Sequence, residues 1–299
     1  MGDDASRQDV DSTKERLHSI DSKSQLYEFV RDKNSTNAEN FRRRRRNPSE
    51  RSEGVDTYVE RLESKDSLKH PSKLSHRGDI MKFKCLVLDH DDTVVDSSAS
   101  IHYPSFVEYL KIARPHLADK YTLEEYFEKN FHPGILELFT EEIGLSETEL
   151  AEEEEFWREF VKNHIPHAYP GMSEIIAEFK AKGGIVAVDS HSVAENIIRD
   201  YKANNLPDPD VIYGWDIPKE MRKPAPGTLF DLMKKFELKP EEILVVDDLK
   251  PGYDMARGAG VPFAAASWAY NVPSIRDFMR ENCDFFLESV EDLRALLFD

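Results

Sequence analysis

Two aspartates at the end of an apolar segment carry the chemistry for which this sequence is best suited. Asp89 and Asp91 follow the run 85–88 (Cys-Leu-Val-Leu), which predicts a buried strand of a parallel sheet. Open α/β sheets bind their ligands at the carboxyl ends of such strands. Two carboxylates two residues apart suit a divalent cation and a reactive phosphate, because one can act as a nucleophile while the other carries a proton.

The same residues also allow two plainer interpretations. An Asp-x-Asp-x-Thr pattern ending at Thr93 could be a polar turn in an acid-rich chain. An EF-hand calcium loop fits poorly, because no glycine follows where the sharp turn needs one and Ser100 stands where the bidentate glutamate belongs. The choice therefore depends on residues further along the chain.

Two further polar groups lie close to predicted strands. Ser190 follows a strand predicted over 185–188, where its hydroxyl and nearby backbone amides could hold phosphoryl oxygens or cap the next helix. Lys223 precedes Pro224, with a second proline at Pro226. This arrangement could present a positive charge on a stiffened backbone, or form an ordinary surface turn.

A second pair of acids, Asp247 and Asp248, ends the apolar run 243–246, which also predicts a strand. Adjacent carboxylates at a strand end repel each other and raise each other's pKa unless a cation lies between them. The alternative is that they cap the helix that follows.

Taken in order, these four groups resemble the haloacid dehalogenase superfamily, and the resemblance covers about residues 82–299. Members that remove halogens lack an acid two residues after the nucleophile, so Asp91 points to the phosphatases and phosphomutases. The position of the inserted helices resembles the subgroup with an all-helical cap, which contains phosphoglycolate phosphatases and β-phosphoglucomutases. The resemblance implies a Mg²⁺-dependent reaction through an aspartyl phosphate.

The family pattern also implies a role for each matching residue. Asp89 would attack phosphorus, while Asp91 would protonate the leaving oxygen and then deprotonate the hydrolytic water. The remaining implied ligands are Ser190 and Lys223 for the phosphoryl oxygens, and Asp89, the backbone carbonyl of Asp91, and one or both of Asp247 and Asp248 for Mg²⁺. Such a site neutralises charge around the transferring group, which is the main requirement of phosphoryl transfer.

One position departs from the commonest family pattern, and the substrate residues are less well defined. Many members carry another acid where this chain has Gly252. Substrate contacts are expected from the inserted helices, where His132 and His102 are the candidates. Arg114 and Lys129 could also reach a second anionic part of a substrate, although each of the four fits an ordinary surface residue as well.

The remaining chain predicts a doubly wound parallel sheet with helices on both faces, formed by residues 81–96 and 170–299. Residues 97–169 predict a small all-helical cap without a strand. The helices expected in the cap span 104–117, 122–131, 134–143 and 146–164. In the second part of the core, the expected strands span 185–188, 211–214, 243–246 and 263–266, and the expected helices span 173–182, 193–204, 227–236, 251–260, 273–282 and 290–298.

Residues 1–80 predict a disordered polar tail. They contain no tryptophan and only four other aromatic residues, which leaves too little apolar surface to offset the entropy of ordering. The five arginines Arg42, Arg43, Arg44, Arg45 and Arg46 could be a solvated run, or could contact an anionic membrane surface or a nuclear import factor.

Charge and composition limit the partners. Residues 1–80 carry a net charge of +1 and residues 81–299 carry −19, which together give the total of −18. So acidic a body argues against nucleic acid as a partner, although a local lysine and a bound cation still allow a small phosphorylated metabolite. Two cysteines, no long apolar run and no secretory signal favour a cytoplasmic protein, with nuclear or peripheral membrane association through the tail as the alternative.

The function predicted from the sequence is therefore a Mg²⁺-dependent phosphatase of a small phosphorylated metabolite. A sugar phosphomutase of the β-phosphoglucomutase type and a binding protein that kept the fold without turnover remain alternatives. The substrate and the oligomeric state stay open.

Overall fold

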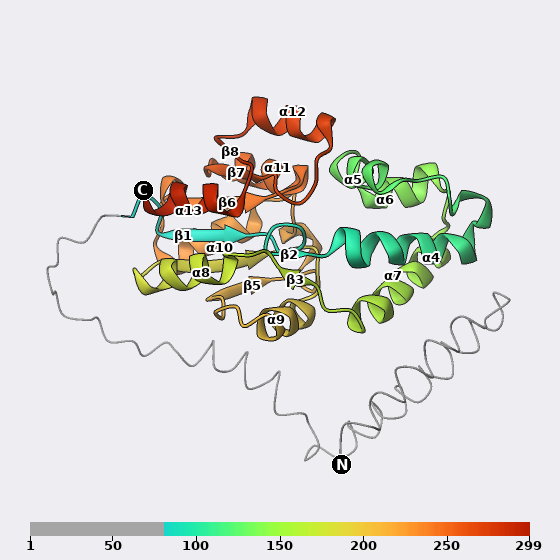
Figure 1. Cartoon of the computed structure of the whole chain (residues 1–299), viewed down its shortest axis with the longest axis horizontal. Helices are drawn as coiled ribbons and strands as arrows, with labels where there is room; N and C mark the ends of the chain where they lie inside the picture. Colours follow the sequence, from blue (N-terminus) through green and yellow to red (C-terminus); the bar gives the residue numbers. More distant parts are fainter. Residues whose placement is uncertain (1–80) are drawn as a thin grey trace, which may run out of the picture. The chain divides into compact units, whose positions relative to one another are not determined.

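A six-stranded parallel sheet forms the centre of the chain in the computed structural model, which describes residues 81–299 (Figure 1). The predictions for residues 1–80 lie outside this part. The strands follow the order β5-β4-β1-β6-β7-β8 across the sheet. Their bounds are β1 (Cys85–Leu88), β4 (Ile185–Asp189), β5 (Val211–Tyr213), β6 (Ile243–Asp247), β7 (Phe263–Ala266) and β8 (Phe285–Leu287).

The strand β1 lies in the middle of the sheet, between β4 and β6. Leu88 is opposite Val188 on one side and Val246 on the other. The residues that follow these three positions therefore leave the sheet at the same level. Since the chain order reverses here, this edge is also the point where open α/β sheets bind ligands.

Helices cover both faces of the sheet, which confirms the predicted doubly wound arrangement. Leu86 and Leu88 point to one face, whereas Cys85 and Val87 point to the other, as the alternation of side chains along a strand requires. The first face is packed by α8 (Met172–Ala181), α9 (Ala194–Ala203) and α13 (Val290–Phe298), and the second by α10 (Gly227–Phe236), α11 (Lys250–Ala259) and α12 (Pro273–Asn282).

A group of helices is inserted between β1 and β4, and residues 97–169 are called the cap below. These helices pack on a hydrophobic cluster of their own around Phe106, Tyr126 and Phe139. Figure 1 draws them at one end of the sheet. They comprise a π-helical turn (Ser98–His102), α4 (Tyr103–Ala113), α5 (Leu123–Phe131), α6 (Ile135–Glu137), a second π-helical turn (Leu138–Glu142) and α7 (Glu147–Lys162).

Two helix starts in the cap follow from the sequence pattern. Thr122 and Glu125 form a capping box at the start of α5. Ser146 caps α7 and forms a second capping box with Glu149. Each box satisfies backbone N–H groups that would otherwise have no partner at the helix start.

Several elements differ from the sequence prediction. The cap connects to the core through a short antiparallel pair, β2 (Val95–Asp96) and β3 (His167–Ala168), where no strand was expected. The predicted helix 134–143 breaks into α6 and a π-helical turn, and β8 was not predicted at all. Strands of two or three residues are too short for an alternating pattern to stand out. Within 81–299 no helix is long and apolar enough to cross a membrane.

Candidate active site

Three residues from separate elements meet in a buried ion-pair group at the carboxyl edge of the sheet. The ammonium Nζ of Lys223 lies 2.7 Å from Oδ1 of Asp89 and 2.7 Å from Oδ2 of Asp247. Asp89 follows β1, Asp247 ends β6, and Lys223 lies in the loop between β5 and α10. Since all three side chains are buried, neither carboxylate would be tolerated here without a compensating charge.

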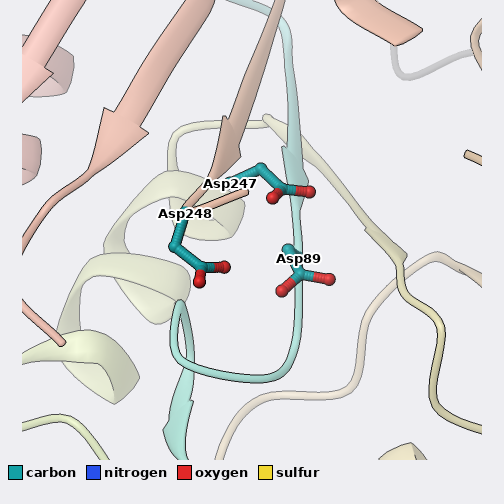
Figure 2. A group of neighbouring side chains, drawn as sticks. All are labelled: Asp89, Asp247 and Asp248. Carbon is teal, nitrogen blue, oxygen red and sulfur yellow. The ribbon is translucent and has the colours of Figure 1, made fainter. Parts of the chain in front are cut away.

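Asp248 adds a third carboxylate beside this group. Asp89, Asp247 and Asp248 can each offer one oxygen such that the three atoms lie within 4.8 Å of one another (Figure 2). Burial raises the pKa of Asp89 and of Asp248 well above the ordinary value, and the neighbouring carboxylates raise both further.

This group of acids fits a divalent cation. One lysine faces three buried carboxylates, so the group lacks positive charge. Carboxylate oxygens at this spacing are the protein ligands that Mg²⁺ prefers, with water or phosphate oxygens in its other positions. The residues expected to bind the metal are therefore brought together, and these three offer side-chain oxygens for it.

The position of Asp247 explains the glycine at position 252. The strand β6 continues through Asp247, so the expectation that the strand ends at Val246 was wrong by one residue. Oδ1 of Asp247 accepts a hydrogen bond from the backbone N–H of Leu249 at 2.8 Å. A Cβ atom at Gly252 would lie 2.1 Å from Oδ2 of Asp247, so a side chain here would displace the carboxylate.

Several donors hold the carboxylate of Asp91. Oδ1 lies 2.8 Å from the hydroxyl of Ser97 and 3.1 Å from Nε2 of His102. Oδ2 accepts a hydrogen bond from Ser192 at 2.7 Å. Burial alone would raise the pKa of Asp91, but the charge and the hydrogen bond of His102 outweigh it and hold this pKa well below its usual range.

Ser190 also reaches the site, next to Asp91 and Ser192. Its hydroxyl lies 3.4 Å from Oδ2 of Asp91 and accepts a hydrogen bond from the backbone N–H of Ser192 at 3.0 Å. It does not cap α9, because Val193 is the N-cap of that helix. Ser192 makes the shorter contact with Asp91, a role that sequence reasoning missed although Ser192 lies two residues away.

The two histidines proposed for substrate binding behave differently. His102, at the start of the cap, contacts Asp91 directly and accepts a hydrogen bond at Nδ1 from Nε1 of Trp157 at 3.1 Å. Burial lowers the pKa of His102, but the carboxylate of Asp91 raises it by more. His132 is exposed after α5, and its side chain makes no hydrogen bond or ion pair within 81–299.

Further residues around Asp248 were not found from the sequence. The hydroxyl of Tyr270 lies 3.1 Å from Oδ2 of Asp248, and that of Thr93 lies 3.4 Å from Oδ1. Tyr270 also stacks on Phe127 of the cap, with ring centroids 4.0 Å apart. Tyr270 lies in the loop after β7, and loops after parallel strands are a place where such a residue can be sought.

The parallel sheet flanked by helices, with acids at its carboxyl edge, is a Rossmann-like α/β fold. A family model described as haloacid dehalogenase-like hydrolase matches residues 86–266, more than half of the chain. The chain belongs to this family, which confirms the resemblance inferred from the four motifs.

Individual relatives agree with this assignment. A pyrophosphatase, PpaX, from Bacillus cereus is 25% identical over 73% of this chain and 98% of its own length. Two solved structures share the fold. A Bacteroides fragilis protein assigned to the haloacid dehalogenase-like hydrolases has a TM-score of 0.60 at 20% identity, over 71% of this chain and all of its own. CbbY from Rhodobacter sphaeroides, solved with phosphate, has a TM-score of 0.53 at 20% identity, over 72% of this chain and 99% of its own.

Proposed function

We propose that this hydrolase is a phosphatase that acts on a small phosphorylated metabolite through a phosphoryl group carried on Asp89. The observation that supports this most strongly is the position of Lys223, whose ammonium bridges Asp89 and Asp247 at 2.7 Å from each. A carboxylate can attack a phosphate dianion only where positive charge offsets their repulsion. Lys223 supplies one such charge beside the attacking atom.

In the first step, the carboxylate of Asp89 attacks phosphorus and the bond between phosphorus and the leaving oxygen breaks. Asp91 gives a proton to that oxygen. The same residue is kept ionised by His102 before substrate binds, so it must first take a proton from solvent. An approaching phosphate dianion favours this protonation, because a nearby like charge raises the pKa of a carboxylic acid.

In the second step, water attacks the phosphorus of the aspartyl phosphate and the bond to Asp89 breaks. Asp91, again a carboxylate, accepts the proton of the attacking water. Ser190 and Lys223 bind the phosphoryl oxygens during both steps. The three donors around Asp91, which are Ser97, Ser192 and His102, orient its carboxylate toward the reacting oxygen.

Asp89, Asp247 and Asp248 would hold Mg²⁺, together with the backbone carbonyl of Asp91 as the family resemblance implies. Mg²⁺ would add positive charge at the phosphoryl oxygens, where the charge of the transition state develops.

Phosphate release from a panel of phosphate esters tests the proposal. The wild-type chain should release phosphate with Mg²⁺ and lose this activity in EDTA, and Asp89→Asn should remove it because an amide cannot form the aspartyl phosphate. Ser173→Ala is a suitable control, because its hydroxyl is exposed and contacts the backbone of Asn205 outside the site. Activity that survives in Asp89→Asn would overturn the proposal. A chain that needs a bisphosphate and releases little phosphate would be a mutase instead.

A further inference from the structure

A carboxylate occupies the centre of the apolar face of α7. Glu153 lies one helical turn before Trp157, and Leu150, Phe156 and Phe160 lie on the same face. Glu153 is only half-buried, so solvent or a ligand can reach it. An acid at the centre of a packing face is unusual unless it has a partner.

This face of α7 is the one turned toward the reacting groups. Trp157 donates a hydrogen bond to His102, and His102 contacts Asp91. Glu153 therefore lies one helical turn from the tryptophan that connects α7 to His102 and, through it, to Asp91.

The carboxylate of Glu153 receives no hydrogen bond in the described part of the chain. Among residues 81–299 no N–H or O–H group donates a hydrogen bond to this carboxylate, and no lysine or arginine forms an ion pair with it. Burial raises its pKa to about 7, with Glu154 adding to the rise and His102 opposing it. A half-buried carboxylate without a donor gains from any ligand group that supplies one.

The cap has no free cation to balance this acid. Residues 97–169 contain six lysines and arginines against fifteen acids, a net charge of −9. Each of the six pairs with a cap glutamate: Lys111 with Glu108, Arg114 with Glu149, Lys120 and Lys129 with Glu142, Arg158 with Glu154, and Lys162 with Glu159. Arg114 and Lys129, which could have met a second anionic group of a substrate, are thus already engaged.

Two basic residues of the core, Arg222 and Lys250, are also already engaged. The guanidinium of Arg222 stacks over Trp215 at 4.2 Å from the ring centroid, and its Nε donates to the carbonyl of Ile217. Lys250 pairs with Asp254 within α11. A phosphate monoester with a second phosphate or a carboxylate would therefore bring an unpaired anion next to Glu153, which costs free energy as any close like-charge contact does.

We propose that Glu153 selects the substrate, and that the substrate is a phosphate monoester whose leaving group carries hydroxyl or ammonium groups rather than a second anion. This inference rests on the proposed phosphatase activity and adds the substrate class. The carboxylate of Glu153 accepts hydrogen bonds from such donors. It disfavours compounds such as pyrophosphate or phosphoglycolate, whose second half is anionic.

Three two-carbon esters of equal length test this directly: 2-hydroxyethyl phosphate, phosphoethanolamine and phosphoglycolate. They differ only in the terminal group, which is neutral, cationic or anionic. Steady-state kcat/KM for the first two should exceed that for phosphoglycolate by at least about tenfold in the wild type. In Glu153→Gln, which keeps the shape and removes the charge, this ratio should fall severalfold toward one.

Glu147→Gln is the matched control, because Glu147 lies in the first turn of the same helix, is exposed and precedes Glu153 by six residues. It should keep the wild-type ratio. A wild type that prefers phosphoglycolate or pyrophosphate, or a ratio that Glu153→Gln leaves unchanged, would overturn the assignment of Glu153 while leaving the phosphatase activity intact. Failure to hydrolyse any ester, p-nitrophenyl phosphate included, would instead overturn the proposed function and this inference with it.

Discussion

The indole Nε1 of Trp157 donates a hydrogen bond to Nδ1 of His102 over 3.1 Å, and the two rings stack at 27°. An indole N–H can only donate, so this contact requires a lone pair on Nδ1 with the ring proton on Nε2, and it opposes the protonation of His102 that the carboxylate of Asp91 favours. From that position His102 donates to Oδ1 of Asp91 at 3.1 Å. Trp157 on α7 of the cap therefore fixes the tautomer of the histidine that contacts Asp91.

Replacing Trp157 by phenylalanine should lower kcat by roughly tenfold, because a group that orients and polarises a histidine from behind typically contributes at this level. Without the indole N–H, Nδ1 of His102 is free to take a proton, so the pKa of His102 should rise. Nitrogen NMR of the imidazole would check both the tautomer and its pKa. In a His102→Ala background the same replacement should have almost no further effect on kcat. An equal loss in both backgrounds would mean that Trp157 acts through packing alone.

Gly252→Ala should displace the carboxylate of Asp247 from its position in the site. The added Cβ would lie 2.1 Å from Oδ2 of Asp247, a carboxylate held between Lys223 and the backbone of Leu249. We expect a lower melting temperature and a large loss of kcat. Gly258→Ala on the same helix is the control, since its Cβ would meet the Pro226 ring at 3.4 Å and alanine favours helix. Equal stability of both variants would contradict the close contact.

Most of the core, and the grouping of the acids at its carboxyl edge, could be predicted from the sequence for a physical reason. The segments 263–266, 273–282 and 290–298 are strand or helix with the predicted bounds, because each is an apolar run or a helix with clear start and stop signals. The acids that follow β1 and end β6 meet because parallel strands end at one edge, whereas Lys223 reaches them from the loop between β5 and α10.

The contacts that cross from one element to another could not be predicted. Nothing in the sequence brings Trp157 to His102, which is 55 residues away, or Tyr270 to Asp248. The exposed position of His132 depends on how α5 ends and α6 begins. The short pair β2 and β3 carries no pattern that distinguishes it from a loop.

The two acids at the end of β6 should differ in their effect on Mg²⁺. Both oxygens of Asp247 already accept hydrogen bonds, from Lys223 at 2.7 Å and from Leu249 at 2.8 Å. Asp248 receives longer contacts, of 3.1 and 3.4 Å, and keeps more capacity for a metal. Asp248→Asn should therefore raise the Mg²⁺ concentration for half-maximal activity more than Asp247→Asn does.

Thermal unfolding gives an independent measure of the same site. Mg²⁺ at one hundred times its Kd should stabilise the wild type by about 2.7 kcal/mol, a rise in Tm on the order of 5–10 °C. This rise should be smallest in the double variant Asp247→Asn/Asp248→Asn. If the two single variants and the double variant all respond to Mg²⁺ as the wild type does, the metal site lies elsewhere.

Asp189 should make stability depend on pH. Burial at the end of β4 raises the pKa of this carboxyl to about 6 from an ordinary 3.8, although Lys223 and Thr228 oppose the shift. Between these two pH values the folded chain keeps a proton that the unfolded chain gives up, so stability falls as pH rises through this window. The contribution is on the order of 3 kcal/mol, since each pKa unit corresponds to about 1.4 kcal/mol.

Denaturant titrations of the wild type and Asp189→Asn between pH 4 and 7 would measure this contribution. The variant cannot titrate at position 189, so its stability should fall less steeply with rising pH. Parallel curves would mean that the buried carboxyl at this position has an ordinary pKa in the folded chain.

The phosphoryl group on Asp89 is the central element of this account, and mass spectrometry after rapid acid quench detects it most directly. The wild type should be quenched during turnover of an ester that it hydrolyses with Mg²⁺, and then digested. We expect one phosphoryl group on the peptide that contains Asp89, and none on that peptide from Asp89→Asn. Turnover without any phosphoryl group on this peptide, together with activity retained by Asp89→Asn, would contradict the account.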